Sequence, residues 1–153
     1  MSIDPEIREL SPQSAVTEVA VTGADGIPSA VDSGFPRLFG RLAELGVEPA
    51  GPPYIRYLRT GAELELELGI PVGPDAGQPS RLPGGRAAVL RHVGPFSGLR
   101  SACEALQRWA AERGEQAAGP FWESYVTNPR EEPDSSRWVT EIFLPLRTST
   151  AAG

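Results

Sequence analysis

Six short stretches of the chain have the pattern of β-strands, with clear alternation of apolar and polar residues at 17–23 and 62–72, and two further stretches carry apolar residues every three or four positions. Alternation predicts β-strands, because successive side chains of a strand point to opposite faces of the sheet. The three-to-four spacing predicts amphipathic helices. The expected strands lie at residues 17–23, 53–59, 62–72, 86–93, 121–127 and 137–146, and the expected helices at about 33–46 and 97–113. The sequence therefore predicts the order strand, helix, strand, strand, given twice.

The ends of the first helix are marked by residues with known capping preferences. Ser33 is a suitable N-cap, Pro36 suits a first turn and Gly46 suits the stop. The second helix is expected to end at Gly114, with Cys103 inside its apolar stripe as a core residue.

The two halves also match in sequence, which indicates an internal duplication. The segment "GPPYIRYL" at 51–58 matches "GPFWESYV" at 119–126 at Gly, Pro and the second aromatic residue, Tyr57 or Tyr125. The segments "GIPV" at 69–72 and "FLPL" at 143–146 also match, which aligns Glu67 with Glu141.

A duplicated β-α-β-β unit predicts an α+β fold, an antiparallel sheet with both helices on one face. We expect a flexible tail at residues 1–14, one domain at 15–147 and a second tail at 148–153. Within the domain we expect repeat one at 15–72, a linker rich in Gly, Pro and Ser at 73–84 and repeat two at 85–147.

The carboxylate of Glu123 stands out, because it lies between two aromatic residues in a predicted strand. Its counterpart in repeat one is the apolar Ile55. Alternation places Tyr125 and Phe121 on the face of Glu123, and Trp122 on the opposite face. A buried glutamate must be paired, neutral or matched by a ligand cation. An exposed carboxylate at a strand rim is the alternative that the pattern leaves open.

Composition narrows the class of protein. The 153 residues carry a net charge of −6 with all fourteen basic residues being Arg, so direct binding of nucleic acid is not expected. One His and one Cys give no metal-ligand cluster, and the sequence has no Gly-rich phosphate loop, so neither metal nor cofactor is expected. Apolar runs are too short to span a membrane and no signal peptide is visible, which predicts a cytoplasmic protein.

Four motifs in order resemble the GyrI-like small-molecule-binding family, which also supplies the effector-binding domain of MerR- and AraC-type multidrug regulators. The motifs are "HVGPF" at 92–96, "GPFWESY" at 119–125, "NP" at 128–129 and "TEIFLPL" at 140–146. The resemblance covers roughly residues 15–147. It implies a duplicated fold of the SHS2 type and a central, aromatic-lined pocket with a buried glutamate at the position of Glu123. Only about fifteen residues precede the first expected strand, so a helix-turn-helix domain is not expected.

Two functions follow from this resemblance. The first is a binding protein for lipophilic, often cationic aromatic compounds, with a role in drug or toxin resistance. The second is a hydrolase that opens strained cyclopropane rings of DNA-alkylating natural products, with Glu123 and Tyr125 as catalytic residues. The family resemblance also suggests contact with gyrase as a further function, which the residues do not test. Both a monomer and a dimer are compatible with the sequence. The candidate ligand-binding residues are Tyr54, Tyr57, Phe121, Trp122, Glu123, Tyr125, Trp138 and Glu141, with Glu141 as the alternative central carboxylate.

Overall fold

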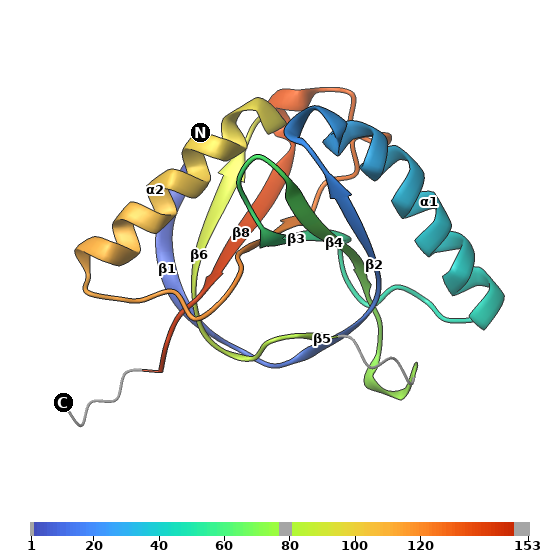
Figure 1. Cartoon of the computed structure of the whole chain (residues 1–153), viewed down its shortest axis with the longest axis horizontal. Helices are drawn as coiled ribbons and strands as arrows, with labels where there is room; N and C mark the ends of the chain where they lie inside the picture. Colours follow the sequence, from blue (N-terminus) through green and yellow to red (C-terminus); the bar gives the residue numbers. More distant parts are fainter. Residues whose placement is uncertain (1, 77–80, 149–153) are drawn as a thin grey trace. The chain divides into compact units, whose positions relative to one another are not determined.

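The computed structural model describes residues 2–76 and 81–148. The chain divides into two compact units. Unit 1 combines Met1–Ser11 with Gly84–Gly153, and unit 2 is Pro12–Pro83. Each unit contains antiparallel strands and one long helix, as Figure 1 shows. The two units are described separately below.

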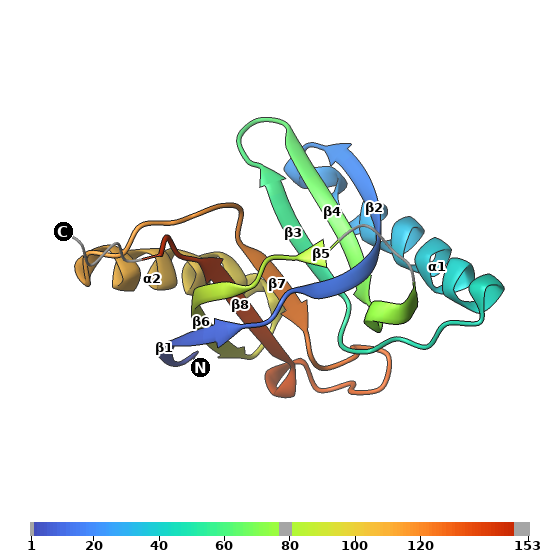
Figure 2. The ribbon, with the colours of Figure 1, turned by 90° about the horizontal axis from the view of Figure 1, so that it is seen from below.

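Unit 2 holds the first repeat. Its strands are hydrogen-bonded in the order β3-β4-β2-β5, and every pair is antiparallel. Figure 2 shows the long β3–β4 hairpin with β2 beside it. The elements are β2 (Gln13–Thr22), α1 (Ile27–Leu45), β3 (Tyr54–Arg59), β4 (Leu64–Pro71) and β5 (Arg81–Leu82).

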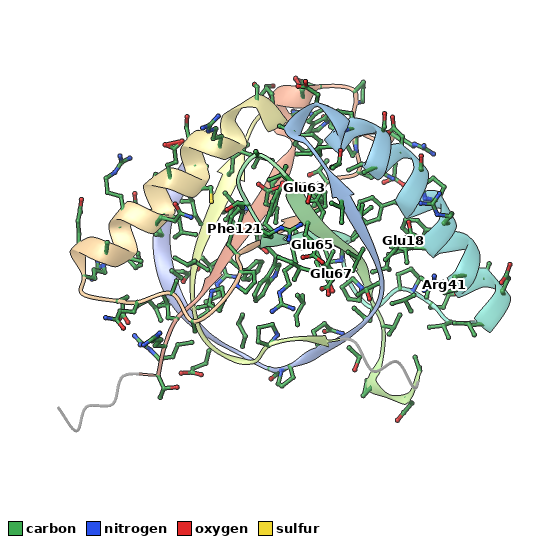
Figure 3. All side chains as sticks on the ribbon, viewed as in Figure 1. Glu18, Arg41, Glu63, Glu65, Glu67 and Phe121 are labelled. Atoms are coloured by element: carbon green, nitrogen blue, oxygen red, sulfur yellow. The ribbon has the colours of Figure 1, made fainter. Side chains whose placement is uncertain are left out.

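The alternating strand β4 determines how unit 2 packs. Leu64, Leu66 and Leu68 are buried, whereas the glutamates that alternate with them point to the other face. The three glutamates, Glu63, Glu65 and Glu67, are labelled in Figure 3. Helix α1 covers the leucine face at close range, because a Cβ atom at Gly34 would lie only 2.6 Å from Leu68 Cδ2.

Helix α1 is longer than the sequence pattern predicts. It begins at Ile27 rather than at Ser33, with a proline in its first turn at position 28, and Pro36 lies inside the helix. The predicted start is therefore wrong. A proline inside a helix costs about 3 kcal/mol, since it removes one backbone hydrogen bond, and burial of Leu38 and Leu42 offsets this cost. The predicted stop is confirmed: Gly46 adopts a left-handed conformation with φ of 67°.

Unit 1 holds the second repeat and one additional strand. Its strands are hydrogen-bonded in the antiparallel order β1-β6-β8-β7. Helix α2 follows a short 3-10 turn at Phe96–Gly98. The elements are β1 (Ser2–Leu10), β6 (Gly85–Val93), α2 (Leu99–Glu112), β7 (Trp122–Tyr125) and β8 (Val139–Pro145).

One hydrophobic cluster joins α2 to the sheet of unit 1. The helix contributes a buried stripe that follows the predicted spacing, and β6 and β8 contribute the opposing residues. The cluster consists of Ala88, Leu90, Leu99, Ala102, Cys103, Leu106, Ala110, Ile142, Leu144 and Leu146. The face of the sheet that carries Leu90 and Ile142 is therefore the face that α2 covers.

The N-terminal segment differs from the expected flexible tail at residues 1–14. Residues 2–10 form β1, which pairs with β6 of the second repeat although it directly precedes β2 of the first. The pairing is irregular between Ile3 and Glu6, where Pro5 lacks a backbone donor. The sequence pattern does not indicate this strand, because the segment contains charged residues and a proline and has no apolar face. Backbone hydrogen bonds to β6 hold it in place.

The α+β class, the antiparallel pairing and the repeated β-α-β-β order are confirmed. The second repeat's strands and helix lie within three residues of their predicted ends. Two predictions depend on how the two units are arranged: that both helices cover the same face of the sheet, and that a central pocket exists. Both stay predictions. Part of the expected linker at 73–84 and most of the tail at 148–153 lie outside the described residues.

Candidate functional site

Strand β7 places Glu123 on the face of unit 1 that helix α2 covers. Glu123 pairs directly with Ile142 of β8, which pairs with Leu90 of β6, so the three side chains form a row. The side chain of Glu123 is only 6% exposed. An isolated carboxylate at such a position would be strongly disfavoured, so its partners determine what it can do.

Tyr125 is one partner of this carboxylate. Its hydroxyl donates a hydrogen bond to Glu123 Oε1 over 2.8 Å. The two residues are two apart on one strand, which is the spacing that puts them on the same face. A carboxylate has lone pairs for several donors, and hydrogen bonds to its charged form favour that form. The pair is therefore suited to meet a positive charge.

Aromatic rings lie beside this pair. Phe96, in the turn before α2, packs edge-on to Tyr125 with ring centroids 5.7 Å apart. It also contacts Trp138 at 4.7 Å between centroids. The indole Nε1 of Trp138 donates to the backbone carbonyl of Glu132, which fixes the ring. Phe96 remains partly exposed to solvent. The three rings form an apolar surface next to a buried carboxylate.

A second row of side chains continues the same face. Thr140 pairs with Tyr125 on one side and with His92 on the other. His92 Nε2 lies 3.1 Å from the carbonyl oxygen of Pro95, and its ring packs against Gly98. These contacts give His92 a role in holding the turn before α2. The Thr140 hydroxyl is buried without a hydrogen-bond partner among the described residues.

The opposite face of the same sheet holds two of the predicted site residues. Trp122 is buried and stacks on Phe143, with ring centroids 5.2 Å apart and an interplanar angle of 11°. Glu141 accepts a hydrogen bond from Arg8 of β1 over 3.5 Å. Trp122 and Glu141 are thus separated from Glu123 by the sheet itself, and Glu141 has the Arg partner that a structural carboxylate needs.

Unit 2 holds the remaining two predicted residues. Tyr54 is 1% exposed, and its hydroxyl donates to Glu67 Oε2 over 3.1 Å. Burial, followed by the negative charge of Glu67, raises the pKa of the Tyr54 phenol above its usual range. Tyr57 pairs with Leu66 and so points to the face that α1 covers. Within unit 2 the Tyr54–Glu67 pair is a structural contact.

The predicted residues therefore divide into three groups. Glu123, Tyr125 and Phe121 share one face of unit 1, and Trp138 reaches the group through Phe96. Phe121, labelled in Figure 3, packs against the hydrophobic cluster under α2. Phe96 is not among the ligand-binding residues predicted from the sequence. The signal was present in "HVGPF", where an aromatic residue follows a Gly-Pro turn beside a predicted helix start.

The pKa of the buried Cys103 thiol is affected by the charge of Glu123. Burial, and then the nearby negative charge of Glu123, raise the pKa of the Cys103 thiol from its usual range to about 12. As the pH rises, the Cys103 thiol is therefore deprotonated at a lower pH in the unfolded chain than in the folded protein. We expect the contribution of Cys103 to stability to be complete below pH 9 and to be lost as the pH rises toward 12. Urea unfolding of the parent protein and of Cys103→Ala between pH 9 and pH 12 measures this contribution. An identical loss of stability in both proteins would contradict the prediction.

Among the described residues, no three His, Cys, Asp or Glu side chains are grouped as a metal site requires. None of the helices in the described part of the chain is both long and apolar enough to span a membrane.

Comparisons with known proteins identify the fold and the family. Among curated proteins, no sequence relative was found. The C-terminal domain of EcmrR superposes with a TM-score of 0.83 at 18% identity, covering 95% of this chain and 98% of that domain. EcmrR in its DNA complex matches with a TM-score of 0.82 at 18% identity over 95% of this chain, which spans 57% of the EcmrR chain.

Two further structures have the same fold at lower similarity. SAV2435 bound to tetraphenylphosphonium gives a TM-score of 0.63 at 13% identity, over 95% of this chain and 94% of that one. A hydrolase from Listeria innocua also gives 0.63, at 16% identity, over 94% and 91% of the two chains. The model of the GyrI-like small molecule binding domain matches residues 48–147. This chain therefore belongs to the GyrI-like family of small-molecule-binding domains.

Proposed function

We propose that this protein binds lipophilic, aromatic, cationic compounds against Glu123. The observation that carries the proposal is a glutamate that is 6% exposed, accepts a hydrogen bond from Tyr125 and lies beside the Phe96–Tyr125–Trp138 rings. The electrostatic attraction between an ionised carboxylate and a cation is stronger in an apolar environment than at a solvent-exposed position. A cation that brings its own apolar surface keeps that environment dry.

The aromatic surface supplies the second part of the recognition. Stacking and cation–π contacts with Phe96, Tyr125 and Trp138 are each worth about 0.5–2 kcal/mol when water is excluded. The Tyr125 hydroxyl orients the carboxylate, which reduces the conformational cost of binding. The resulting selectivity is for positive charge and planar apolar surface rather than for one chemical structure.

One fold neighbour supports the same ligand class. Tetraphenylphosphonium, the compound bound to SAV2435, is an aromatic cation. We infer a role in sequestration of such compounds in the cytoplasm, and hence in drug or toxin resistance. The binding partner is then a small molecule, with no need for nucleic acid or membrane contact.

A matched pair of dyes tests this proposal. The protein is titrated with 10-methylacridinium and, at mildly alkaline pH, with neutral acridine, which has the same ring system. We expect the cation to bind at least tenfold more tightly, as fluorescence titration will show. Equal affinity for the two dyes would remove the electrostatic basis of the proposal.

Hydrolysis is the second candidate function, and the 2.8 Å contact between Tyr125 and Glu123 is the observation that favours it. Glu123 could deprotonate a water molecule, whose oxygen attacks a carbon of a cyclopropane ring conjugated to a carbonyl. The ring bond breaks, its electron pair moves through the new C=C bond onto the carbonyl oxygen, and the resulting enolate takes up the proton that Glu123 removed, which regenerates the carboxylate. The Tyr125 hydroxyl donates to Glu123 in this structure, so it must turn from Glu123 before it can donate its one hydrogen bond to that oxygen. The Listeria innocua hydrolase shares the fold alone.

Turnover separates the two functions. The protein is incubated in substoichiometric amount with a cyclopropane-containing alkylating compound, and water-added product is followed by mass spectrometry. A hydrolase forms many equivalents of product, and Glu123→Gln reduces this rate by about two to four orders of magnitude. A binding protein protects one equivalent of the compound and forms no product.

A further inference from the structure

Unit 1 contains a groove that the proposed ligand site does not use. It is a hollow of about 340 Å³ between strand β1 and helix α2. Figure 1 shows these two elements side by side. Its apolar lining comes from Leu90, Ala105 and Trp109. The remaining lining residues are Asp4, Pro5, Arg108 and Glu112.

This groove lies on the same face of the unit 1 sheet as Glu123, but at the opposite edge of that sheet. Strand β1 is one edge of unit 1 and β7, which carries Glu123, is the other, with β6 and β8 between them. Strands are spaced about 4.8 Å apart, so the two edges are separated by roughly 14 Å. The groove is therefore a separate site, and its existence does not depend on the proposed function.

The charges around the groove favour a cation. Asp4 and Glu112 approach from opposite walls, one on β1 and one on α2. Neither carboxylate, nor the guanidinium of Arg108, forms an ion pair with another described residue. Among the lining residues two carboxylates face one guanidinium, and the second guanidinium nearby, that of Arg113, lies against the Trp109 ring.

Trp109 gives the groove an aromatic wall that already accepts a cation. The guanidinium carbon of Arg113 lies 4.3 Å from the centroid of the Trp109 ring. The indole is held in place because it also packs against the hydrophobic cluster under α2. A rigid aromatic ring next to two carboxylates is the chemistry that recognises an organic ammonium group.

We infer that this groove is a second binding site, for a small arylalkyl ammonium ion, with its apolar body on Leu90, Ala105 and Trp109 and its ammonium group between Asp4 and Glu112. The volume suits a ligand of this size, at the lower limit of small-molecule pockets. A shallow site with exposed charges predicts weak binding, in the high micromolar to millimolar range.

The probe is 2-phenylethylammonium, with neutral 2-phenylethanol and anionic phenylacetate as comparisons. The indole N–H resonance of Trp109, assigned with Trp109→Phe, reports binding at this groove and not at Glu123. We expect a saturable shift of this resonance with the ammonium compound, and binding at least fivefold weaker with the alcohol and the acid.

Four variants test the assignment of residues. Asp4→Asn combined with Glu112→Gln should weaken the ammonium compound at least fivefold, whereas Glu104→Gln, on the same helix but outside the groove, should leave it unchanged. Arg108→Gln should tighten binding about two- to fivefold, an effect that a folding defect cannot produce. Glu123→Gln should not alter the Trp109 shift.

Several results would overturn the inference. These are no saturable Trp109 shift, equal binding of the alcohol, an equal effect of Glu104→Gln and the double variant, or loss of the Trp109 shift in Glu123→Gln. The last result would mean that the probe occupies the site at Glu123 alone. This inference can fail without affecting the proposed function, because the dye titration tests Glu123 whereas the change in the Trp109 resonance tests the groove.

Discussion

Replacement of Glu123 by glutamine will weaken the binding of 10-methylacridinium at least tenfold and will leave acridine within about twofold. Glutamine has nearly the same shape and can still accept the hydrogen bond from Tyr125, so the change removes the charge with little loss of packing. A charge-assisted contact of this kind is worth on the order of 1.5–3 kcal/mol, and 1.4 kcal/mol is a factor of ten in affinity.

Glu141→Gln is the matched control for this variant. Glu141 is the carboxylate that the duplication singles out, but it lies on the other face of the unit 1 sheet and contacts Arg8. We expect its replacement to leave both dye affinities within about twofold. Thermal unfolding of both variants checks that the protein remains folded. If Glu141→Gln abolishes the preference for the cation and Glu123→Gln does not, the central carboxylate is Glu141.

Gly69→Ala will destabilise the protein by about 1–3 kcal/mol or more. Gly69 pairs directly with Tyr54, whose ring lies across the glycine. An added Cβ atom would overlap this ring and approach the phenolic oxygen to 2.5 Å. Since Tyr54 is 1% exposed, its ring has no free space into which to move. The hydrogen bond from Tyr54 to Glu67 would be lost with the ring position.

Gly73→Ala is the matched control for this change. No described atom lies within 4 Å of a Cβ at position 73, so the expected effect is below about 0.5 kcal/mol. Urea unfolding of the two variants and the parent measures the difference. Equal stability of Gly69→Ala and Gly73→Ala would show that the Tyr54 ring does not depend on the glycine.

The periodicity of the sequence predicted the secondary structure of the second repeat well. Strand β8 and helix α2 carry unbroken apolar patterns that match the faces they bury, as the cluster with Leu106 and Ile142 shows. The first repeat was harder. Pro36 and Ser33 indicate a helix start, but both lie inside α1, since packing of Leu38 and Leu42 overrides the local signal.

Strand β1 could not be predicted from its pattern. Its described side chains include Glu6, Arg8 and an exposed Ile7, so it has no buried apolar face. The strand is held by hydrogen bonds to β6, a partner more than seventy residues away in the sequence. Long-range pairing of this kind leaves no local trace.

The candidate site was predictable in part. Glu123 and Tyr125 were identified because a carboxylate interrupts an apolar pattern that Ile55 maintains in the first repeat. Strand alternation separated both from Trp122, and the stacking of Trp122 on Phe143 places it on the other face. The contribution of Phe96 was missed, since its contact with Tyr125 depends on the path of the turn before α2.

A crystal structure of the complex with 10-methylacridinium tests the central claim most directly. We expect the positively charged ring to lie in unit 1 within contact distance of the Glu123 carboxylate, with its plane against Phe96, Tyr125 or Trp138. Density for the dye on the Trp122–Phe143 face, or a bound dye with no contact to Glu123, would contradict the claim.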